Sequence, residues 1–526
     1  MLKQTLHQQS FSPQILSPGN TAPAPDLVPV IREQPADLET PVSVYLKLAG
    51  QGPSFLLESV TGGEQVARYS FIGVNPSRAF IIRGETLECH TLQTSGVDRG
   101  RSIHCDILTS PDPLAGLRAE LARYHQLPVP GLPRLVGGLV GYLSYDIVRY
   151  FEPSVPLSPH ADLPEAVFLL ADTLVAFDHA FGRLVLIANT HLDGDERLAR
   201  DAAEARLDAI QQQLAGPVPK NTALSSLDFP PAQPILKELE SNLTQEQFTS
   251  AVLKAKEYIA AGEIFQVVLS QRLSRETSAT PFNIYRALRR LNPSPYMYFF
   301  DFNTLIDQAG ESGKQQPLRV IGASPEMHVR LEGHKASVRP IAGTRPRGGT
   351  PQRDAALESE LLADPKELAE HVMLVDLGRN DLGRVCEFGS VKVPEQMVVE
   401  RYSHVMHIVS HVEGQLSPEY DAFDLMRATF PAGTVTGAPK IRAMQIIHEL
   451  EGEPRGPYAG AVGYFSYDGS LDTCITIRTL LMRGQTISIQ AGAGVVADSD
   501  PQREYQETLN KARALAVAVE MAESET

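Results

Sequence analysis

Tryptophan is absent from this sequence of 526 residues, and cysteine is rare. The four cysteines are Cys89, Cys105, Cys386 and Cys474, and none of them belongs to a Cys-x-x-Cys pair. Neither a zinc site nor a disulfide framework is therefore predicted, and the scattered thiols are typical of a reduced, cytoplasmic protein. No cysteine stands in a Gly-x-Cys-x-Gly turn, which excludes a cysteine nucleophile at a strand-to-helix elbow.

Long apolar runs and an excess of positive charge are also missing. No apolar stretch approaches the roughly eighteen residues that a transmembrane helix needs. The segment before Pro23 lacks the apolar core of a secretory signal, so no such signal is expected. The formal charge of −16 disfavours nucleic acid and anionic membranes as partners. With 43% hydrophobic residues, the chain is expected to form one large or several ordinary globular domains.

Composition along the chain predicts four regions. Residues 1–27 are rich in Pro, Ser and Gln and predict a flexible amino-terminal arm. Residues 28–215 alternate strand and helix patterns and form the first predicted domain. A segment rich in Gly, Pro and Ser over 216–235 predicts a linker, and residues 236–526 form the second predicted domain.

The sequence contains an internal echo. GLVGYLSYD at Gly138–Asp146 matches GAVGYFSYD at Gly460–Asp468 at most positions, and IGVNP at Ile72–Pro76 precedes the first copy much as IGASP at Ile321–Pro325 precedes the second. The later interval is longer by about seventy residues, as an insertion into one of two related units would be. We therefore expect two related α/β halves, of which the second carries added machinery.

The added segment includes Lys366–Arg384, KELAEHVMLVDLGRNDLGR. On a helix Glu367 and Glu370 share one face, and Glu504 and Glu507 repeat that spacing near the carboxyl terminus. Each pair alone is typical of a solvated helix face. Together, however, two such pairs could frame one hard cation, and carboxylates without Cys or His favour Mg²⁺.

Several turns and one arginine surround these carboxylates in the sequence. Pro340–Arg345 is expected to end a strand in a glycine, Gly433–Pro439 places hydroxyls between glycines, and Gly492–Gly494 is expected to follow a strand over Thr486–Gln490. Arg478 is expected in an alternating strand, where an inward arginine needs an anionic partner. Each feature could be purely structural, but jointly they suggest an anionic substrate with a divalent metal.

These motifs together resemble the chorismate-binding enzymes, over about residues 240–520. The resemblance is carried by Lys366–Arg384, GASPE at Gly322–Glu326, PIAGTRPRG from Pro340, His407, Thr434, Tyr458, Arg478, Gly492–Gly494 and Glu504 with Glu507. The first half resembles the amino-terminal domain of the anthranilate synthase branch, through LLES at Leu56–Ser59 and RYSFIG at Arg68–Gly73. The expected fold is α+β, a large sandwich of two related halves with antiparallel β-sheets packed in the centre and helices outside.

Two positions indicate the reaction within that family. Members that add water carry a lysine base where this sequence has Gln266, and glutamine cannot take a proton at neutral pH. Aminodeoxychorismate synthases carry a nucleophilic lysine at the position of Ala342. The resemblance thus implies attack of ammonia at C2 of chorismate, loss of the C4 hydroxyl and elimination of pyruvate to give anthranilate. Three alternatives remain. The first is aminodeoxychorismate synthase, and the second is an enzyme that stops at the amino-intermediate, which is aminodeoxyisochorismate. The third is a catalytically silent subunit that senses tryptophan.

The resemblance also implies a role for each site residue. Glu370 and Glu507 correspond to Mg²⁺ ligands, while Glu367 and Glu504 would hold water molecules around the metal. Glu326 corresponds to the general acid that protonates the departing hydroxyl, which requires a raised pKa. Further catalytic residues are His407, for pyruvate elimination, and Gln266; the chorismate contacts are Gly343, Thr344, Thr434, Tyr458, Arg478, Gly492, Ala493 and Gly494.

Two partners follow from the same resemblance. Because the chain shows no glutaminase nucleophile, ammonia is expected to come from a separate glutamine amidotransferase subunit. Tryptophan is expected to act as a feedback inhibitor at a pocket that joins the two halves. The predicted tryptophan-binding residues are Leu57, Glu58, Ser59, Pro295, Tyr296, Met297 and Cys474.

Overall fold

The computed structural model describes residues 26–50, 52–60, 68–94, 100–126, 129–192, 195–219, 239–303, 305, 316–402 and 405–524. All but the last two residues of the predicted arm, and the predicted linker from residue 220 onward, lie outside these ranges. Within the described ranges, no helix is both long and apolar enough to cross a membrane.

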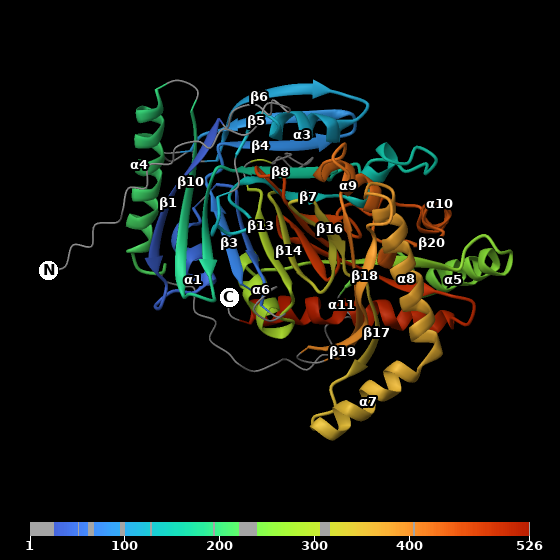
Figure 1. Ribbon diagram of the computed structural model, residues 1–526. Helices are drawn as coiled ribbons and strands as arrows, with labels where there is room; N and C mark the ends of the chain where they lie inside the picture. Colours follow the sequence, from blue (N-terminus) through green and yellow to red (C-terminus); the bar gives the residue numbers. More distant parts are fainter. Residues whose placement is uncertain are drawn as a thin grey trace.

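Two antiparallel sheets of twelve strands each form the centre of the molecule (Figure 1). The first sheet has the order β1 (Leu27–Pro35), β10 (Arg183–His191), β9 (Thr173–Asp178), β3 (Tyr69–Val74), β2 (Ser54–Glu58), β13 (Tyr296–Asp301), β14 (Leu318–Ser324), β23 (Thr479–Arg483), β24 (Thr486–Val495), β12 (Gln266–Glu276) and β11 (Glu240–Ser241), with β20 (Gly437–Ala438) also on β12. The second has the order β17 (Ile341–Pro346), β19 (Val405–Gln415), β16 (Lys335–Val338), β15 (Met327–Glu332), β22 (Leu471–Ile475), β21 (Ala461–Ser466), β7 (Gly138–Leu143), β8 (Ala166–Ala171), β4 (Arg78–Arg83), β5 (Thr86–Leu92) and β6 (Ser102–Thr109), with β18 (Lys392–Arg401) also on β19.

Helices cover the outer faces of both sheets (Figure 1). The first sheet is covered by α1 (Pro41–Leu48), α4 (Glu196–Leu214), α5 (Gln245–Ala260), α6 (Pro281–Leu291), α10 (Lys440–Glu451) and α11 (Pro501–Glu523). The second is covered by α3 (Pro113–Leu121), α7 (Pro351–Ala363), α8 (Pro365–Gly383) and α9 (Ala422–Thr429). Between the sheets lies an apolar core that includes the buried aromatic rings of Tyr142, Phe300 and Phe302. The predicted α+β sandwich is therefore confirmed.

The two halves follow the same path through the sheets. In the first half, β2 and β3 enter the first sheet, β4 to β8 form part of the second, and β9 and β10 return to the first. In the second half, β13 and β14, then β15, β16, β19, β21 and β22, and then β23 and β24 take the corresponding places. The echoed sequences pair directly, with Gly138 opposite Ser466 and Leu143 opposite Ala461. The expectation of two related halves is confirmed.

The second half contains an insertion that the first half lacks. Strands β17 and β18 and helices α7 and α8 all lie in the sequence between the paired strands β16 and β19, whereas the corresponding pair, β5 and β6, is joined by residues 93–101 alone. Helix α8 begins at Pro365 because the Asp364 side chain accepts hydrogen bonds from the amides of Lys366 and Glu367. Its buried side packs on β17, β19 and β16, and Glu367 lies at this contact, because Arg345 of β17 donates to its Oε1 at 3.2 Å.

Candidate active site

The carboxylates of α8 and α11 lie near the start of both helices, where each helix brings a lysine within electrostatic reach of the other's glutamates. Burial raises the pKa of Glu370, and the nearby Glu367 raises it further. Burial likewise raises the pKa of Glu504, with a further contribution from Glu507. Lys511, from α11, partly offsets the shift of Glu370 on α8, so the two predicted pairs face one shared region.

This donor set fits a hard cation. All the side-chain donors are carboxylate oxygens, and the pKa values of Glu370 and Glu504 are raised mainly by burial, with a smaller contribution from the neighbouring carboxylate. Among the described residues, no three Asp, Glu, His or Cys side chains converge as a closed metal cage. Mg²⁺ usually binds through one or two carboxylates together with water and substrate oxygens, so it does not require such a cage.

Glu326 lies at the turn between β14 and β15, beside the same region. Glu326 is only 5% exposed. Thr434 Oγ1 donates a hydrogen bond to its Oε1 at 2.6 Å. Burial raises the pKa of Glu326 to about 8, and the charge of Glu370 adds to this rise. The hydrogen bonds from Thr434 and the Ile341 amide act in the opposite direction. The raised pKa that the sequence analysis required is therefore present.

A bulge in β17 presents Gly343 and Thr344 to His407 of β19. The glycine lies inside the strand rather than at its end, so the expected strand ending was wrong; the register shifts between Ala342 and Thr344. Gly343 has a φ of +70°, and a Cβ there would lie 3.2 Å from Glu367 Oε2. The Nδ1–H of His407 donates to the Gly343 carbonyl at 3.0 Å. This bond leaves Nε2 as the proton-accepting nitrogen, and burial lowers the pKa of the ring.

Glycines of β24 make room for two site side chains. Gly492–Gly494 lie within β24 and not after it, because the strand extends to Val495; that expectation was wrong. A Cβ at Gly494 would lie 2.7 Å from Gln266 Nε2, and one at Gly492 would lie 2.6 Å from the Tyr458 hydroxyl. Pairing with β23 stops at Ile489, so β23 is not the partner of the glycine backbone.

Gln266 holds an unusual position between the β24 glycines and α8. Its Nε2 donates to Glu370 Oε1 at 3.3 Å, and the residue is only 5% exposed. Its Oε1 is buried and has no hydrogen-bond partner among the described residues. A buried amide oxygen without a partner is costly, and it offers an acceptor to a small ligand that carries N–H groups.

Arg478 occupies a bend between two sheets and not an alternating strand, so that prediction was wrong. It lies between β22 of the second sheet and β23 of the first, with a φ of +51°. Such a backbone is unfavourable for a side chain larger than glycine and often marks a functional position. Burial lowers the pKa of Arg478, while Glu507 and Tyr458 raise it. The one hydrogen bond described for its side chain, to the Lys511 carbonyl, is long at 3.4 Å.

Lys511 was missed by the sequence analysis. Its Nζ donates to the Gly492 carbonyl at 2.9 Å and pairs with Glu507 at 2.7 Å. The only signal in the sequence was its position four residues after Glu507, a spacing that is common on solvated helices. The structure thus adds a cation between the β24 glycines and the second carboxylate pair.

The predicted tryptophan-binding residues all line one pocket between the two sheets. The wall from the first sheet includes Leu57, Glu58, Ser59, Pro295, Tyr296 and Met297, and Cys474 lies on the facing sheet. Strands β2 and β13 bring the two groups together, because Met297 pairs with Glu58. Arg134, Arg330 and Asp472 also line the pocket, and no pattern in the sequence indicated them.

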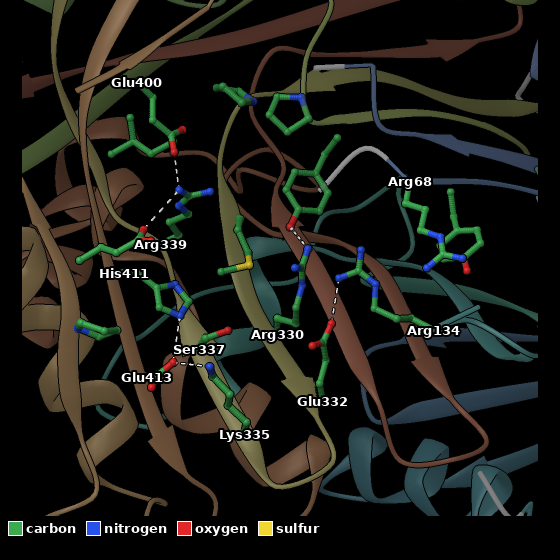
Figure 2. A pocket seen from close by; sticks show the side chains of 18 of the residues that line it. Arg68, Arg134, Arg330, Glu332, Lys335, Ser337, Arg339, Glu400, His411 and Glu413 are labelled. Atoms are coloured by element: carbon green, nitrogen blue, oxygen red, sulfur yellow. Dashed lines mark hydrogen bonds and ion pairs between the residues drawn. The ribbon is translucent and has the colours of Figure 1, made fainter. Parts of the chain in front are cut away.

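A larger cleft of about 1000 Å³ adjoins this pocket and shares Arg134, Tyr296 and Arg330 with it. Figure 2 shows its charged lining, in which Arg134 pairs with Glu332 at 2.8 Å and Arg339 pairs with Glu400. None of the predicted catalytic or chorismate-binding residues lines this cleft. The cleft nevertheless borders the candidate catalytic centre, because its lining includes Ile341, whose amide bonds Glu326, and Tyr402, whose ring lies 5.6 Å from that of His407.

Comparison with known proteins is consistent across sequence and structure. A family model described as chorismate binding enzyme matches residues 53–517. Anthranilate synthase component 1 of Pseudomonas putida is 47% identical over 94% of this chain and 96% of its own. The same-named protein of Synechocystis is 47% identical over 96% of this chain and 99% of its own.

Solved structures agree with these relatives. Anthranilate synthase component I of Streptococcus pneumoniae superposes with a TM-score of 0.69 at 36% identity, covering 91% of this chain and 98% of that one. The menaquinone-specific isochorismate synthase of Escherichia coli has a TM-score of 0.67 at 20% identity, covering 94% and 95%. The second likeness concerns the fold alone.

Proposed function

This chain belongs to the chorismate-binding enzyme family, and on that basis we propose how its residues perform its reaction. It acts on chorismate as an anthranilate synthase of the component 1 type, in the biosynthesis of tryptophan. The reaction replaces the C4 hydroxyl of chorismate by an amino group at C2 and then eliminates pyruvate. The chemistry requires an amine nucleophile, an acid for the hydroxyl and a base for the elimination.

The observation that carries the assignment of ammonia as nucleophile is the state of Gln266. Its buried Oε1 lacks a partner in the part of the chain that the structure describes, and its Nε2 donates to Glu370. The amide cannot remove a proton from water, but its oxygen can accept an N–H of ammonia and orient the nitrogen lone pair. Ammonia needs no deprotonation before it attacks, so a base is unnecessary at this position.

Glu326 and His407 then serve opposite proton transfers. The neutral carboxyl of Glu326, supported by Thr434, donates a proton to the departing C4 hydroxyl. The neutral imidazole of His407 accepts the C2 proton at Nε2 when pyruvate leaves. Arg478, which is partly buried and weakly partnered, binds the enolpyruvyl carboxylate, and Tyr458 and the β24 glycines complete the substrate contacts.

Glu370 and Glu507 are the proposed Mg²⁺ ligands, with Glu367 and Glu504 holding its water molecules. The bound ion would neutralise the ring carboxylate of chorismate and act as a Lewis acid and template. The chain's own contribution is to place these carboxylates opposite one another and to moderate their repulsion with Lys511.

Two partners and a location complete the proposal. Ammonia is supplied in the cell by a glutamine amidotransferase subunit in a heteromer. Tryptophan inhibits by binding the pocket between the sheets, where aromatic and sulfur side chains accept the indole and Glu58 and Arg330 carry the charges that match an amino acid. All four cysteines are unpaired, which supports a reducing, cytoplasmic location.

One assay tests this function. Purified protein is mixed with chorismate, Mg²⁺ and ammonium at alkaline pH, and anthranilate fluorescence and pyruvate are measured. We expect equal amounts of both products, loss of turnover on chelation, and no turnover with glutamine alone. An amine product without pyruvate would support the aminodeoxyisochorismate alternative, and a protein inactive with ammonium would contradict the assignment.

A further inference from the structure

Arg455 is a buried arginine that lies beside the catalytic centre without reaching it. It follows α10 on a loop and is 3% exposed. Its guanidinium donates from Nε and Nη2 to the two oxygens of Glu451, at 2.8 and 2.6 Å. A buried ion pair is tolerated only when the remaining N–H groups of the guanidinium also have hydrogen-bond acceptors. The other acceptors of Arg455 therefore identify the segments that it holds in place.

Two backbone carbonyls supply the remaining hydrogen bonds. Nη1 donates to the Val435 carbonyl and Nη2 to the Val268 carbonyl, both at 2.7 Å. Val435 ends the short 3₁₀ helix Gly433–Val435, whose Thr434 donates to the proposed acid Glu326. Val268 stands two residues after Gln266 on β12. One planar group therefore fixes the distance between the segment that holds the acid and the strand that holds the amide.

The flat faces of the guanidinium also support a substrate contact. Its central carbon lies 4.8 Å from the ring centre of Tyr145 and 5.5 Å from that of Tyr458. The Tyr458 hydroxyl occupies the space beside Gly492, where an added Cβ would lie 2.6 Å from it. Stacking on arginine restricts the ring of Tyr458, whereas lysine could not provide a flat surface.

The first half of the chain holds this loop in position. Asp146 accepts the amide of Arg455 at 3.2 Å and that of Gly456 at 2.7 Å, one on each carboxylate oxygen. Tyr145 donates its own amide to the Gly456 carbonyl at 2.8 Å. The counterpart of Asp146 in the echoed sequence is Asp468, which instead accepts a hydrogen bond from the amide of Ser470 in a hairpin turn. The two related aspartates have therefore taken different roles.

We propose that Arg455 is a positioning residue that aligns Thr434, and through it Glu326, with the amine site, and that Asp146 holds Arg455 in place from the other half. The inference rests on the proposed function and adds to it a residue outside the contact range of chorismate. Its effect is on kcat, because the general acid acts after chorismate has bound.

Arg455→Lys is the primary test, because it keeps the charge and removes the planar fork. We expect kcat with ammonium to fall about 100-fold, the loss typical of a misplaced catalytic group, and KM for chorismate to change less than about threefold. Asp146→Asn should lower kcat in the same way, because an amide nitrogen cannot accept the second backbone N–H. Arg442→Lys, on the exposed side of α10 where Arg442 pairs with Glu263, is the matched control and should retain full activity.

A double-mutant cycle with Thr434→Val distinguishes positioning from a general loss of structure. If Arg455 acts through Thr434, Arg455→Lys should lower kcat by less than about threefold in the Thr434→Val background. Additive losses, or a lowered Tm with unchanged kcat in Arg455→Lys, would overturn the inference while leaving the proposed function intact. A wild-type protein that forms no anthranilate would instead overturn the proposed function and the inference with it.

Discussion

At the scale of single residues, Glu326 shows how burial prepares a carboxyl group for proton donation. Its pKa is raised to about 8 by burial, so most of the group is protonated at neutral pH. We expect kcat/KM for chorismate to be level below this value and to fall as pH rises through it, because the charged form cannot donate. The measurement must hold the concentration of free ammonia constant, since ammonium itself deprotonates at alkaline pH.

Glu326→Gln is the control for this pH dependence. It should lower kcat by about 10²- to 10⁴-fold, since the amide cannot donate a proton in the same way.

A pKa of Glu326 that is raised in the folded state also means that stability is lost as pH rises between the unfolded and folded pKa values. Relative to Glu326→Gln, the Tm of the wild type should therefore decline from about pH 4.5 to about pH 8. Identical pH profiles of Tm would show that Glu326 titrates normally.

Ser59 and Met297 test the tryptophan pocket at the same scale. The Ser59 hydroxyl is buried without a partner among the described residues, and Met297 is 1% exposed in the pocket wall. Ser59→Phe should fill the pocket and Met297→Thr should make its wall polar, so each should raise the tryptophan concentration for half-inhibition at least about tenfold. The kcat should change little. Ser359→Phe, at an exposed position on α7, should remain fully inhibited; unchanged inhibition in the pocket variants would refute the site.

At the scale of elements, α8 could be predicted from the sequence because its signals are local. The cap Asp364, Pro365 at its start and the spacing of Glu367 and Glu370 are all visible in one short segment. The assembly of the fold could be predicted in outline as well, because the echoed strands carry similar sequences. Both predictions depended on residues that are close together in the chain or repeated within it.

Arg478 and the β24 glycines could not be placed from the sequence for physical reasons. The chain crosses from the second sheet to the first at Arg478, but apolar and polar residues alternate over Ile475–Arg478 as they would in a strand. Gly492–Gly494 resembled a turn because glycine weakens a strand, yet their purpose in β24 is to admit Gln266 and Tyr458. Arg455 gave no signal and Lys511 only the common spacing of four residues from Glu507, because their roles depend on segments far apart in the sequence.

Gly494→Ala tests this account of β24. The added methyl group would lie 2.7 Å from Gln266 Nε2, so the amide must move away from Glu370. We expect kcat with ammonium to fall by at least about tenfold with little loss of Tm, because only the end of a side chain is displaced. Gly383→Ala, at the end of α8 with open space around it, is the control and should keep full activity. Unchanged kcat in Gly494→Ala would separate Gln266 from the reaction.

At the scale of the whole molecule, the proposed tryptophan pocket and the proposed catalytic centre both depend on the junction between the halves. The tryptophan pocket lies between the sheets, and the adjoining cleft is bridged by Arg134 of the first half and Glu332 of the second. A ligand that fits the pocket in only one packing of the halves would favour that packing. Because Asp146 holds the Arg455 loop, a shift of the first half would also reach the catalytic centre.

Because the two halves share both sheets at this junction, we expect that neither predicted domain is active as a separate fragment. Strand β13 pairs with β2, and β21 pairs with β7, so residues 236–526 alone would expose two unpaired strand edges and the apolar core between the sheets. We expect this fragment to aggregate, or to bind a dye for exposed apolar surface, and to form no anthranilate. Co-expression with residues 1–235 should restore a complex with measurable turnover, because each fragment supplies the other's missing edge. A monodisperse, fully active fragment would show that the second half completes its sheets and its Arg455 loop without the first.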